Sequence, residues 1–285
     1  MTMNYLLDEI IDLPNENYIE IYTFLSDRFR AIRQECIIQN CFTRAIIRIH
    51  EQMARFYIYS GYKLLNQANF NATLNDTELK NILLTLKNLY KWGNRDYQFL
   101  SLNQAEILSY DFLFHFNDVP YLIYSQVHFT DANLAKESIK LILDLHNAFF
   151  SKNYYQFFQV FKKLNYLHSC LAYRFVHQVR IQATECMNIS HKALGFPLKA
   201  SFEILCFDSF EETLDFYKSC NLLLDEKSVK FTGKRLTIPT FPLPPASILV
   251  DSKKPRVTKF HKYICSHCPF ARQELDQLIT LESGL

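Results

Sequence analysis

The segment HKYICSHC near the end of the chain contains the residue types best suited to holding a metal. It contains His261, Cys265, His267 and Cys268; Cys265 and Cys268 have the spacing of half a zinc site, and His261 could add a third ligand. A structural zinc site needs four protein ligands, and no second CxxC or HxxxH lies nearby. The segment is therefore a weak zinc candidate against the alternative of a loose or packed tail, and we predict no metal and no cofactor.

Basic side chains gather in the last third of the chain, where they could bind phosphate. One group borders a predicted β-hairpin and a second follows in a short segment; together they are Lys227, Lys230, Lys234, Arg235, Lys253, Lys254 and Arg256. Neutralising a nucleic-acid backbone requires several cations within reach of one strand, and such clusters supply them. The alternative is an ordinary solvated lysine-rich surface. Residues 253–256, KKPR, also fit a short nuclear-import pattern.

Motifs that would indicate an enzyme are absent from the sequence. The chain has only 5 glycines, with no GxGxxG or GxxxxGK[ST] loop. It also contains no HExxH and no GxSxG. Carboxylates such as Asp144, Glu185 and Asp208 are scattered without a pairing that the sequence could fix. We therefore predict no enzyme, with a catalytic pair assembled by folding as the alternative.

Composition indicates a globular protein without a membrane span. Of 285 residues, 49% are hydrophobic and 15% aromatic, which argues against disorder. The net charge of +2 excludes a uniformly basic coat but allows a local basic patch. No apolar run reaches the roughly 18 residues that a span requires, and the N-terminus lacks a secretory pattern. The 8 cysteines mostly lie in apolar helical patterns, so we predict no structural disulfide.

Proline and apolar spacing predict a largely helical chain. Only Pro120 interrupts the span between Pro14 and Pro197. Apolar residues recurring every three or four positions predict helices over residues 18–39, 43–60, 76–92, from 103 onward, 131–150, 153–167 and 169–192. Asp76 or Thr77 is expected to cap the third helix, and Asn103 with Glu106 has capping-box spacing for the fourth. Successive antiparallel hairpins are typical of a solenoid, although no clean repeat period is visible.

The predicted secondary structure changes after Pro197 from long helices to shorter helices and strands. Helices are predicted over 198–207 and 209–221, and alternating apolar residues in 229–238 predict a β-hairpin about a Gly233-Lys234 turn. Helix, helix, hairpin is the order of a winged helix. We therefore predict three parts: a helical-repeat domain over 1–195, a winged helix over 196–250 and a basic tail over 251–285, with one short helix near 272–281.

The stretch from Tyr18 to Gln39 links the chain to a known family. It is an amphipathic helix containing SDRFRAIRQE, preceded by MNYLLDEII. Residues 94–116, 154–184 and 196–224 add three further matches in the same order. Together they resemble the Sac-three/GANP family, helical scaffold subunits of TREX-type messenger-RNA export complexes. Segments that large members carry, including FG repeats and a long C-terminal helix, are missing here, so the chain looks like a small member with little more than the core domain.

The resemblance implies a fold, partners and roles for particular residues. It implies an all-α, PCI/TPR-like helical-hairpin body ending in a winged helix that pairs with a PCI-domain protein and a small acidic DSS-type protein. The composite surface would bind RNA or DNA, with the lysines of the wing as candidates. Residues matching the family's DRxRxxRQ motif are expected to form ion pairs inside the helical body: Asp27, Arg28, Arg30, Arg33 and Gln34.

We therefore predict a non-catalytic scaffold that acts in nuclear messenger-RNA export or processing. The alternative is a protein-only scaffold in a centrosomal, spindle or proteasome-lid-like assembly. The expected location is the nucleus, with the cytoplasm or centrosome as the alternatives, and no membrane partner is expected.

Overall fold

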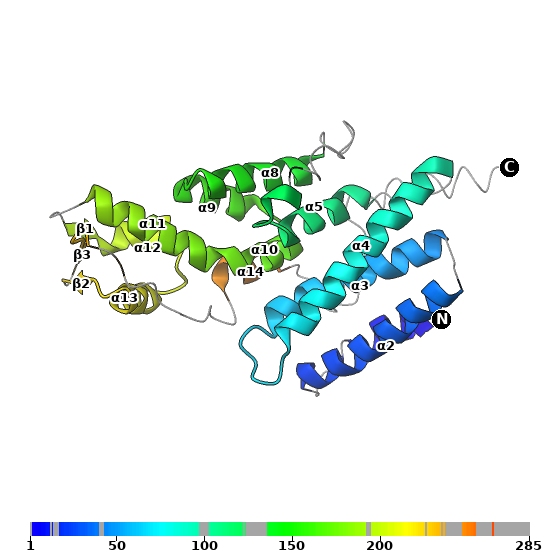
Figure 1. Ribbon diagram of the computed structural model, residues 1–285. Helices are drawn as coiled ribbons and strands as arrows, with labels where there is room; N and C mark the ends of the chain where they lie inside the picture. The colour runs from blue at the N-terminus through cyan, green and yellow to red at the C-terminus, as the bar shows by residue number, and fades with distance from the viewer. Residues whose placement is uncertain are drawn as a thin grey trace. The chain divides into compact units, whose positions relative to one another are not determined.

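A computed structural model describes most of the chain, which is largely helical (Figure 1). The described residues are 2–11, 13, 17–39, 43–96, 103–121, 123, 136–191, 195–225, 227–234, 236, 247–254 and 264. They divide into two compact units, one comprising residues 1–115 with 255–285 and the other residues 116–254.

The first unit is built around three long helices followed by a shorter one. A short helix α1 and a π-helical turn η1 precede the three long helices. The elements are α1 (Thr2–Tyr5), η1 (Leu6–Ile10), α2 (Tyr18–Ile38), α3 (Arg44–Lys63), α4 (Ala72–Asp96) and α5 (Gln104–Phe114). Asn17 and Thr43 cap the first turns of α2 and α3 by accepting hydrogen bonds from the backbone N–H groups of Ile19 and Ile46.

Helix α3 is the centre of this unit. Every residue from His50 to Ser60 is buried, and α3 packs against both α2 and α4. Aromatic rings fill the contact with α2: Phe56 stacks on Tyr22 at 5.9 Å and meets Phe29 edge-on at 5.1 Å. Large side chains in such arrangements contribute both buried area and favourable ring geometry. The aromatic-rich composition is therefore used largely for packing.

The structure corrects the start of one predicted helix and the cap of another. Helix α4 begins at Ala72 rather than near Asp76, because Asn71 accepts the backbone N–H of Leu74 and supplies the cap. Asn103 precedes α5 but makes no side-chain cap. Its amide donates instead to Glu51 at 2.7 Å. Glu106 likewise binds Arg55 rather than the helix terminus, so the predicted capping box is wrong.

The second unit continues with antiparallel helices. Its helical part contains α8 (Glu137–Phe150), α9 (Tyr154–Lys163), α10 (Tyr166–Ala172), the 3-10 turn η2 (Tyr173–Phe175) and α11 (Val176–Ser190). Helix α8 packs against α9, and α9 packs against α11. The helix predicted over 153–167 is divided because Leu164 adopts an extended conformation and Asn165 caps α10.

The end of the second unit is a small mixed module. After α11 come β1 (Gly195–Pro197), α12 (Leu198–Ile204), α13 (Phe210–Ser219), β2 (Leu223–Leu224), β3 (Ser228–Lys230) and the short α14 (Ile248–Asp251). The three strands form an antiparallel sheet in the order β1-β3-β2. Strand β3 therefore lies in the middle, with Phe196 and Leu224 both opposite Val229. We call residues 176–234 the C-terminal module.

The hairpin in this module lies earlier in the chain than predicted. It joins β2 to β3, and the backbone N–H of Asp225 donates to the carbonyl of Ser228 at 2.8 Å. The second arm predicted after Gly233 is not a strand at residue 236, and 237–238 lie outside the described residues. Gly233 has a φ of 68°, which serves the loop that follows β3 rather than a hairpin turn. The polar run after Leu224 supplies the actual turn.

The predicted fold class is confirmed: the chain is mostly helical and carries a small antiparallel sheet near its C-terminal end. The boundary between compact units falls at residues 115 and 116, whereas the predicted boundary between the helical-repeat domain and the winged helix falls at 195. Those domain boundaries stay a prediction, as does the helix near 272–281, which lies outside the described residues.

Candidate nucleic-acid interface

The sheet presents one buried face and one exposed face. Side chains alternate along β3, so Val229 points inward with no exposed area while Ser228 and Lys230 share the opposite face. Phe231, which follows β3, is also buried and meets the ring of Tyr217 from α13 edge-on at 6.4 Å. This burial fixes the backbone from which the neighbouring lysines project.

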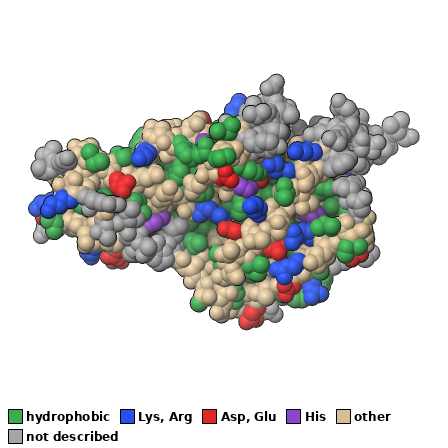
Figure 2. Space-filling model, in the orientation of Figure 1, with side chains coloured by type: hydrophobic (Ala, Val, Ile, Leu, Met, Phe, Trp, Pro, Cys, Tyr) green, Lys and Arg blue, Asp and Glu red, His purple; other side chains and the backbone are tan. Residues whose placement is uncertain are grey.

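Three of the predicted phosphate-binding residues lie together on this part of the fold. Lys227 precedes β3, Lys230 ends it and Lys234 lies in the loop that follows, and all three are exposed. Figure 2 shows Lys and Arg side chains gathered over the sheet, at the left of the view. Lys230 stands opposite Gly195 on β1 and Leu223 on β2. The two cross-strand neighbours of Lys230 are therefore Gly195, which has no side chain, and Leu223, whose apolar side chain is exposed.

One of these lysines already has a carboxylate partner. The ammonium of Lys230 lies 2.8 Å from Oδ2 of Asp225, and both side chains are about half exposed, at 54% and 50%. Such exposed ion pairs contribute little to stability because water and salt screen them. A phosphate would have to compete with Asp225 for this cation.

The loop after β3 is held from α11 by one side chain. The Oδ1 atom of Asn188 accepts the backbone N–H groups of Thr232 at 3.1 Å and Gly233 at 3.0 Å. Its Nδ2 atom donates to the carbonyl of Lys234 at 2.7 Å. Asn188 is 3% exposed. These bonds account for both acceptor sites of the amide oxygen and tie the loop to the helix.

The turn between α12 and α13 is fixed by a buried arginine of α11. Arg180 donates to Glu212 at 2.8 Å and to the carbonyls of Leu205 and Cys206 at 3.2 and 2.6 Å. Its guanidinium also lies 4.1 Å from the ring centroid of Phe207. Glu212 in turn accepts the backbone N–H of Asp208. Sequence reasoning missed this tie, because the partners lie 25 to 32 residues apart.

Lys253 has a different environment from the other predicted phosphate contacts. Its ammonium donates to the carbonyl of Phe161 at 2.6 Å and to Oγ of Ser169 at 2.7 Å. It also lies 4.6 Å from the ring centroid of Phe161. Burial lowers the pKa of Lys253 to about 8. This ammonium is already bound by the helical body, so we remove Lys253 from the set of candidate phosphate contacts; Lys254 is exposed.

Several other predicted site residues lie outside the described part of the chain. They are Arg235, Arg256 and the four weak zinc candidates His261, Cys265, His267 and Cys268. Among the residues that the structure describes, no group of three His, Cys, Asp or Glu side chains is placed to hold a metal. The described cysteines, Cys36, Cys170, Cys186, Cys206 and Cys220, form no disulfide. No helix within the described ranges is long and apolar enough to cross a membrane.

Two arginines of the family motif meet one buried carboxylate. Arg30 and Arg33 on α2 donate to Glu78 on α4 at 3.2 and 2.7 Å, and the Glu78 side chain is 8% exposed. The other motif residues, Asp27, Arg28 and Gln34, are exposed. Arg28 lies 5.7 Å from the ring centroid of Phe24. The motif thus joins α2 to α4 through Glu78.

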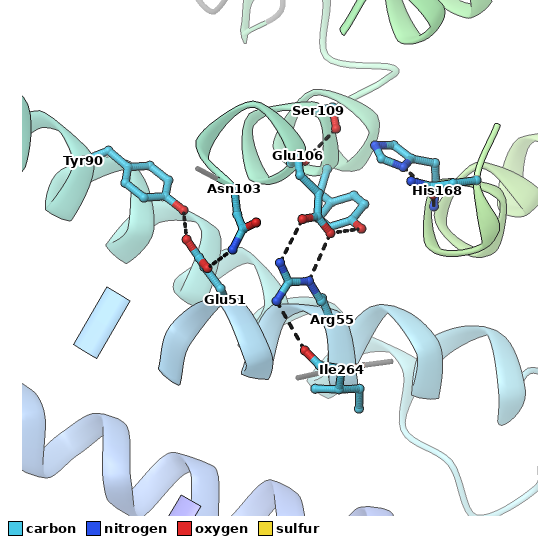
Figure 3. A network of polar contacts seen from close by, with 10 residues as sticks. Glu51, Arg55, Tyr90, Asn103, Glu106, Ser109, His168 and Ile264 are labelled. Atoms are coloured by element: carbon cyan, nitrogen blue, oxygen red, sulfur yellow. Dashed lines mark hydrogen bonds and ion pairs between the residues drawn. The ribbon is translucent and has the colours of Figure 1, made fainter. Parts of the chain in front are cut away.

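A second buried network crosses α3, α4 and α5 (Figure 3). Arg55 makes two hydrogen bonds to Glu106, at 3.0 and 2.8 Å, and a third to the carbonyl of Ile264 at 3.3 Å. Tyr110 also donates to Glu106, at 2.6 Å. One turn away, Glu51 accepts hydrogen bonds from Tyr90 and Asn103 at 2.8 and 2.7 Å.

This network is structural rather than catalytic in its arrangement. Burial acts to lower the pKa of Arg55, but the carboxylate of Glu106 outweighs it and the net pKa is raised. A guanidinium held in this way cannot transfer a proton. Sequence reasoning missed the network. A signal was present, because Glu51 and Arg55 lie four positions apart in a helix segment, residues 50–60, that is otherwise rich in large apolar side chains. Charged residues in such a segment are expected to have buried partners.

Comparison with known proteins gives one consistent family. A model described as the SAC3/GANP family matches residues 1–226. Protein xmas of Drosophila melanogaster is 25% identical over 274 residues, which cover 89% of this chain and 13% of the relative. SAC3 family protein B of Arabidopsis thaliana is 28% identical over 197 residues, which cover 64% of this chain and 12% of the relative. SAC3 family protein 1 of Schizosaccharomyces pombe is 27% identical over 238 residues, which cover 75% of this chain and 23% of the relative.

The chain thus spans less than a quarter of the length of each of these three relatives. The family match includes the helices from α1 to α13 and ends between β2 and β3, so the exposed lysines of the sheet follow it in sequence. It also includes the α2 motif from which the resemblance was predicted. Since the match covers more than half of the 285 residues, this chain belongs to the SAC3/GANP family.

Proposed function

We propose that this protein is a non-catalytic scaffold subunit that pairs with a PCI-domain partner and binds RNA or DNA in nuclear messenger-RNA export or processing. The observation that carries the proposal is the family match over residues 1–226. The small sheet with exposed lysines extends it. A scaffold needs stable surfaces rather than a reactive group, and the buried charged side chains described above are held by hydrogen bonds between helices.

The element order of the C-terminal module supports its assignment as a winged helix. Helix α11 is followed by a strand, two helices and two further strands, and the last strand lies between the other two. The turn between α12 and α13 is fixed by Arg180 and Glu212. A fixed helix-turn-helix with a sheet beside it is the geometry that such modules use at nucleic acid.

Apolar side chains exposed in the same module support a role in partner binding. Leu223 on the edge strand β2 is 65% exposed, Ile189 at the end of α11 is 67% exposed and Phe210 at the start of α13 is 44% exposed. Apolar and aromatic side chains are favoured at the centres of protein interfaces. We assign these exposed side chains to contacts with the winged helix of a PCI-domain partner, with a small acidic DSS-type protein completing the complex.

The charges of the module favour backbone contact over base reading. Among the described residues of the module, the exposed candidate cations are lysines, which act as point charges on phosphate and carry little sequence information. We therefore expect binding without strong sequence preference. Affinity should fall steeply with salt, because each neutralised phosphate releases counterions.

The test measures RNA binding by the purified chain and by its complex with a PCI-domain partner over a series of salt concentrations. The proposal expects the complex to bind more tightly than either protein alone, with a linear dependence of log affinity on log salt. Complex formation without RNA binding at low salt would instead support the protein-only scaffold. Failure of the chain to pair with any PCI-domain protein would overturn the proposed function.

A further inference from the structure

Asn188 is a buried amide whose bonds all go to the loop that carries Lys234. It lies near the end of α11, and its oxygen and nitrogen reach three consecutive residues, Thr232, Gly233 and Lys234. Only one orientation of the amide fits, because the oxygen must face two N–H donors and the nitrogen must face a carbonyl. The three hydrogen bonds of this side chain therefore fix the backbone of residues 232–234 relative to α11.

The loop path itself requires such support. Gly233 has a φ of 68°, in the left-handed region that glycine adopts without steric cost. Glycine also leaves the unfolded chain more freedom, so a loop built around it needs outside contacts to keep one conformation. Phe231 anchors the start of the loop by burial at 2% exposure. Asn188 anchors its end, where Lys234 is exposed.

We propose that Asn188 is a positioning residue for nucleic-acid binding, which fixes the backbone of residues 232–234 so that Lys234 is held ready to contact a phosphate. The inference rests on the proposed RNA binding by the sheet. This support keeps the Lys234 ammonium within reach of one phosphate; when the loop loses it, the phosphate contact and the counterion released by that contact are lost together. Asn188 itself is buried and does not touch the ligand.

The experiment compares Asn188→Ala and Lys234→Ala in the full chain by fluorescence anisotropy with a short single-stranded RNA at several salt concentrations. Loss of one phosphate contact on a single strand reduces the slope of log affinity against log salt by about 0.7. We expect each variant to lose about this amount. The double variant should lose no more than Lys234→Ala alone, because Asn188 acts through Lys234.

A matched control lies on the same helix. Gln178 is an exposed, uncharged residue of α11, and Gln178→Ala should leave the salt slope unchanged. Gly233→Ala disturbs the same loop from its own backbone without altering α11, so it provides an independent test if Asn188→Ala folds poorly. It should give the same reduced slope. A wild-type slope in both Asn188→Ala and Gly233→Ala, or an additive loss in the double variant, would overturn the inference.

Hydrogen exchange separates this inference from the proposed function. In Asn188→Ala, the amides of Thr232 and Gly233 should exchange faster while those of β3 stay protected. Faster exchange together with an unchanged salt slope would show a clamp with no role at phosphate and would overturn the inference alone. Absence of RNA binding by the wild-type chain and its complex would overturn the RNA-binding part of the proposed function and this role together.

Discussion

The Nη1 atom of Arg180 lies 2.8 Å from Oε1 of Glu212, and this pair joins α11 to α13 across the turn that precedes α13. The arginine side chain is 2% exposed, and its other nitrogens donate to the carbonyls of Leu205 and Cys206. A buried charge with partners on every side stabilises one geometry strongly, because any other arrangement leaves it unpaired. The relative placement of the two helices therefore depends on this one side chain.

Arg180→Met should destabilise the protein by roughly 3–5 kcal/mol, since it leaves the Glu212 carboxylate partly buried without its partner. The measurement is urea-induced unfolding followed by circular dichroism. Lys218→Met is the matched control, because Lys218 pairs with Asp215 while both side chains are about 60% exposed. That control should change stability by about 1 kcal/mol or less. Equal effects of the two substitutions would contradict the prediction.

The Arg55 network should respond differently to single and double substitution. Arg55→Met leaves Glu106 buried and removes the donor to Ile264, so we expect a loss of roughly 3–5 kcal/mol. Replacing both partners, Arg55→Met with Glu106→Met, should recover a large part of that loss because no unpaired charge remains. Arg48→Met, at an exposed position on the same helix, is the control. A double variant no more stable than Arg55→Met would refute the ion-pair account.

Periodic apolar spacing was enough to predict the long helices, because α2, α3 and α4 each bury one broad face or more. Their ends were predicted less well. Asn103 and Glu106 have the spacing of a capping box, yet both side chains bond across the unit to Glu51 and Arg55. A buried partner on another helix outweighs a local cap that water can replace, and no local pattern reveals that competition.

The candidate site shows the same limit. Lysine clustering suggested phosphate binding at Lys227, Lys230 and Lys234; these residues are exposed, and their binding stays a prediction. It also included Lys253, whose ammonium is bound by Phe161 and Ser169, more than 80 residues away in sequence. Charge alone cannot distinguish a solvated lysine from one drawn into the body, because the distinction depends on acceptors that only the fold brings near.

The bound ammonium of Lys253 should make stability depend on pH. Burial lowers its pKa in the folded chain from 10.5 to about 8. Both states are protonated at pH 7, and above pH 8 the folded chain loses the proton first, so the unfolded chain binds more protons and stability rises with pH. We expect a gain of roughly 1–2 kcal/mol between pH 8 and 10, relative to Lys253→Met, after allowing for solvent screening.

That comparison uses urea unfolding of both proteins at each pH, so that titration of tyrosines and cysteines common to both cancels in the difference. Lys254→Met, an exposed neighbour, should follow the wild-type profile. A constant difference between wild type and Lys253→Met across this range would show that the ammonium titrates at its ordinary pKa.

Asp225 should act as a competitor for phosphate at Lys230. The two side chains lie 2.8 Å apart at the hairpin and both are about half exposed. Asp225→Asn removes the competing carboxylate and one negative charge near the incoming backbone, so RNA affinity should rise by about 2-fold to 5-fold at low salt, equivalent to roughly 0.4–1 kcal/mol for an exposed pair. Lys230→Gln should lower affinity, and the double variant should match Lys230→Gln more closely than wild type.

Asp215→Asn, which removes an exposed carboxylate paired to Lys218 on α13, controls for net charge. If it raises affinity as much as Asp225→Asn, the gain reflects overall charge and the specific competition at Lys230 is refuted.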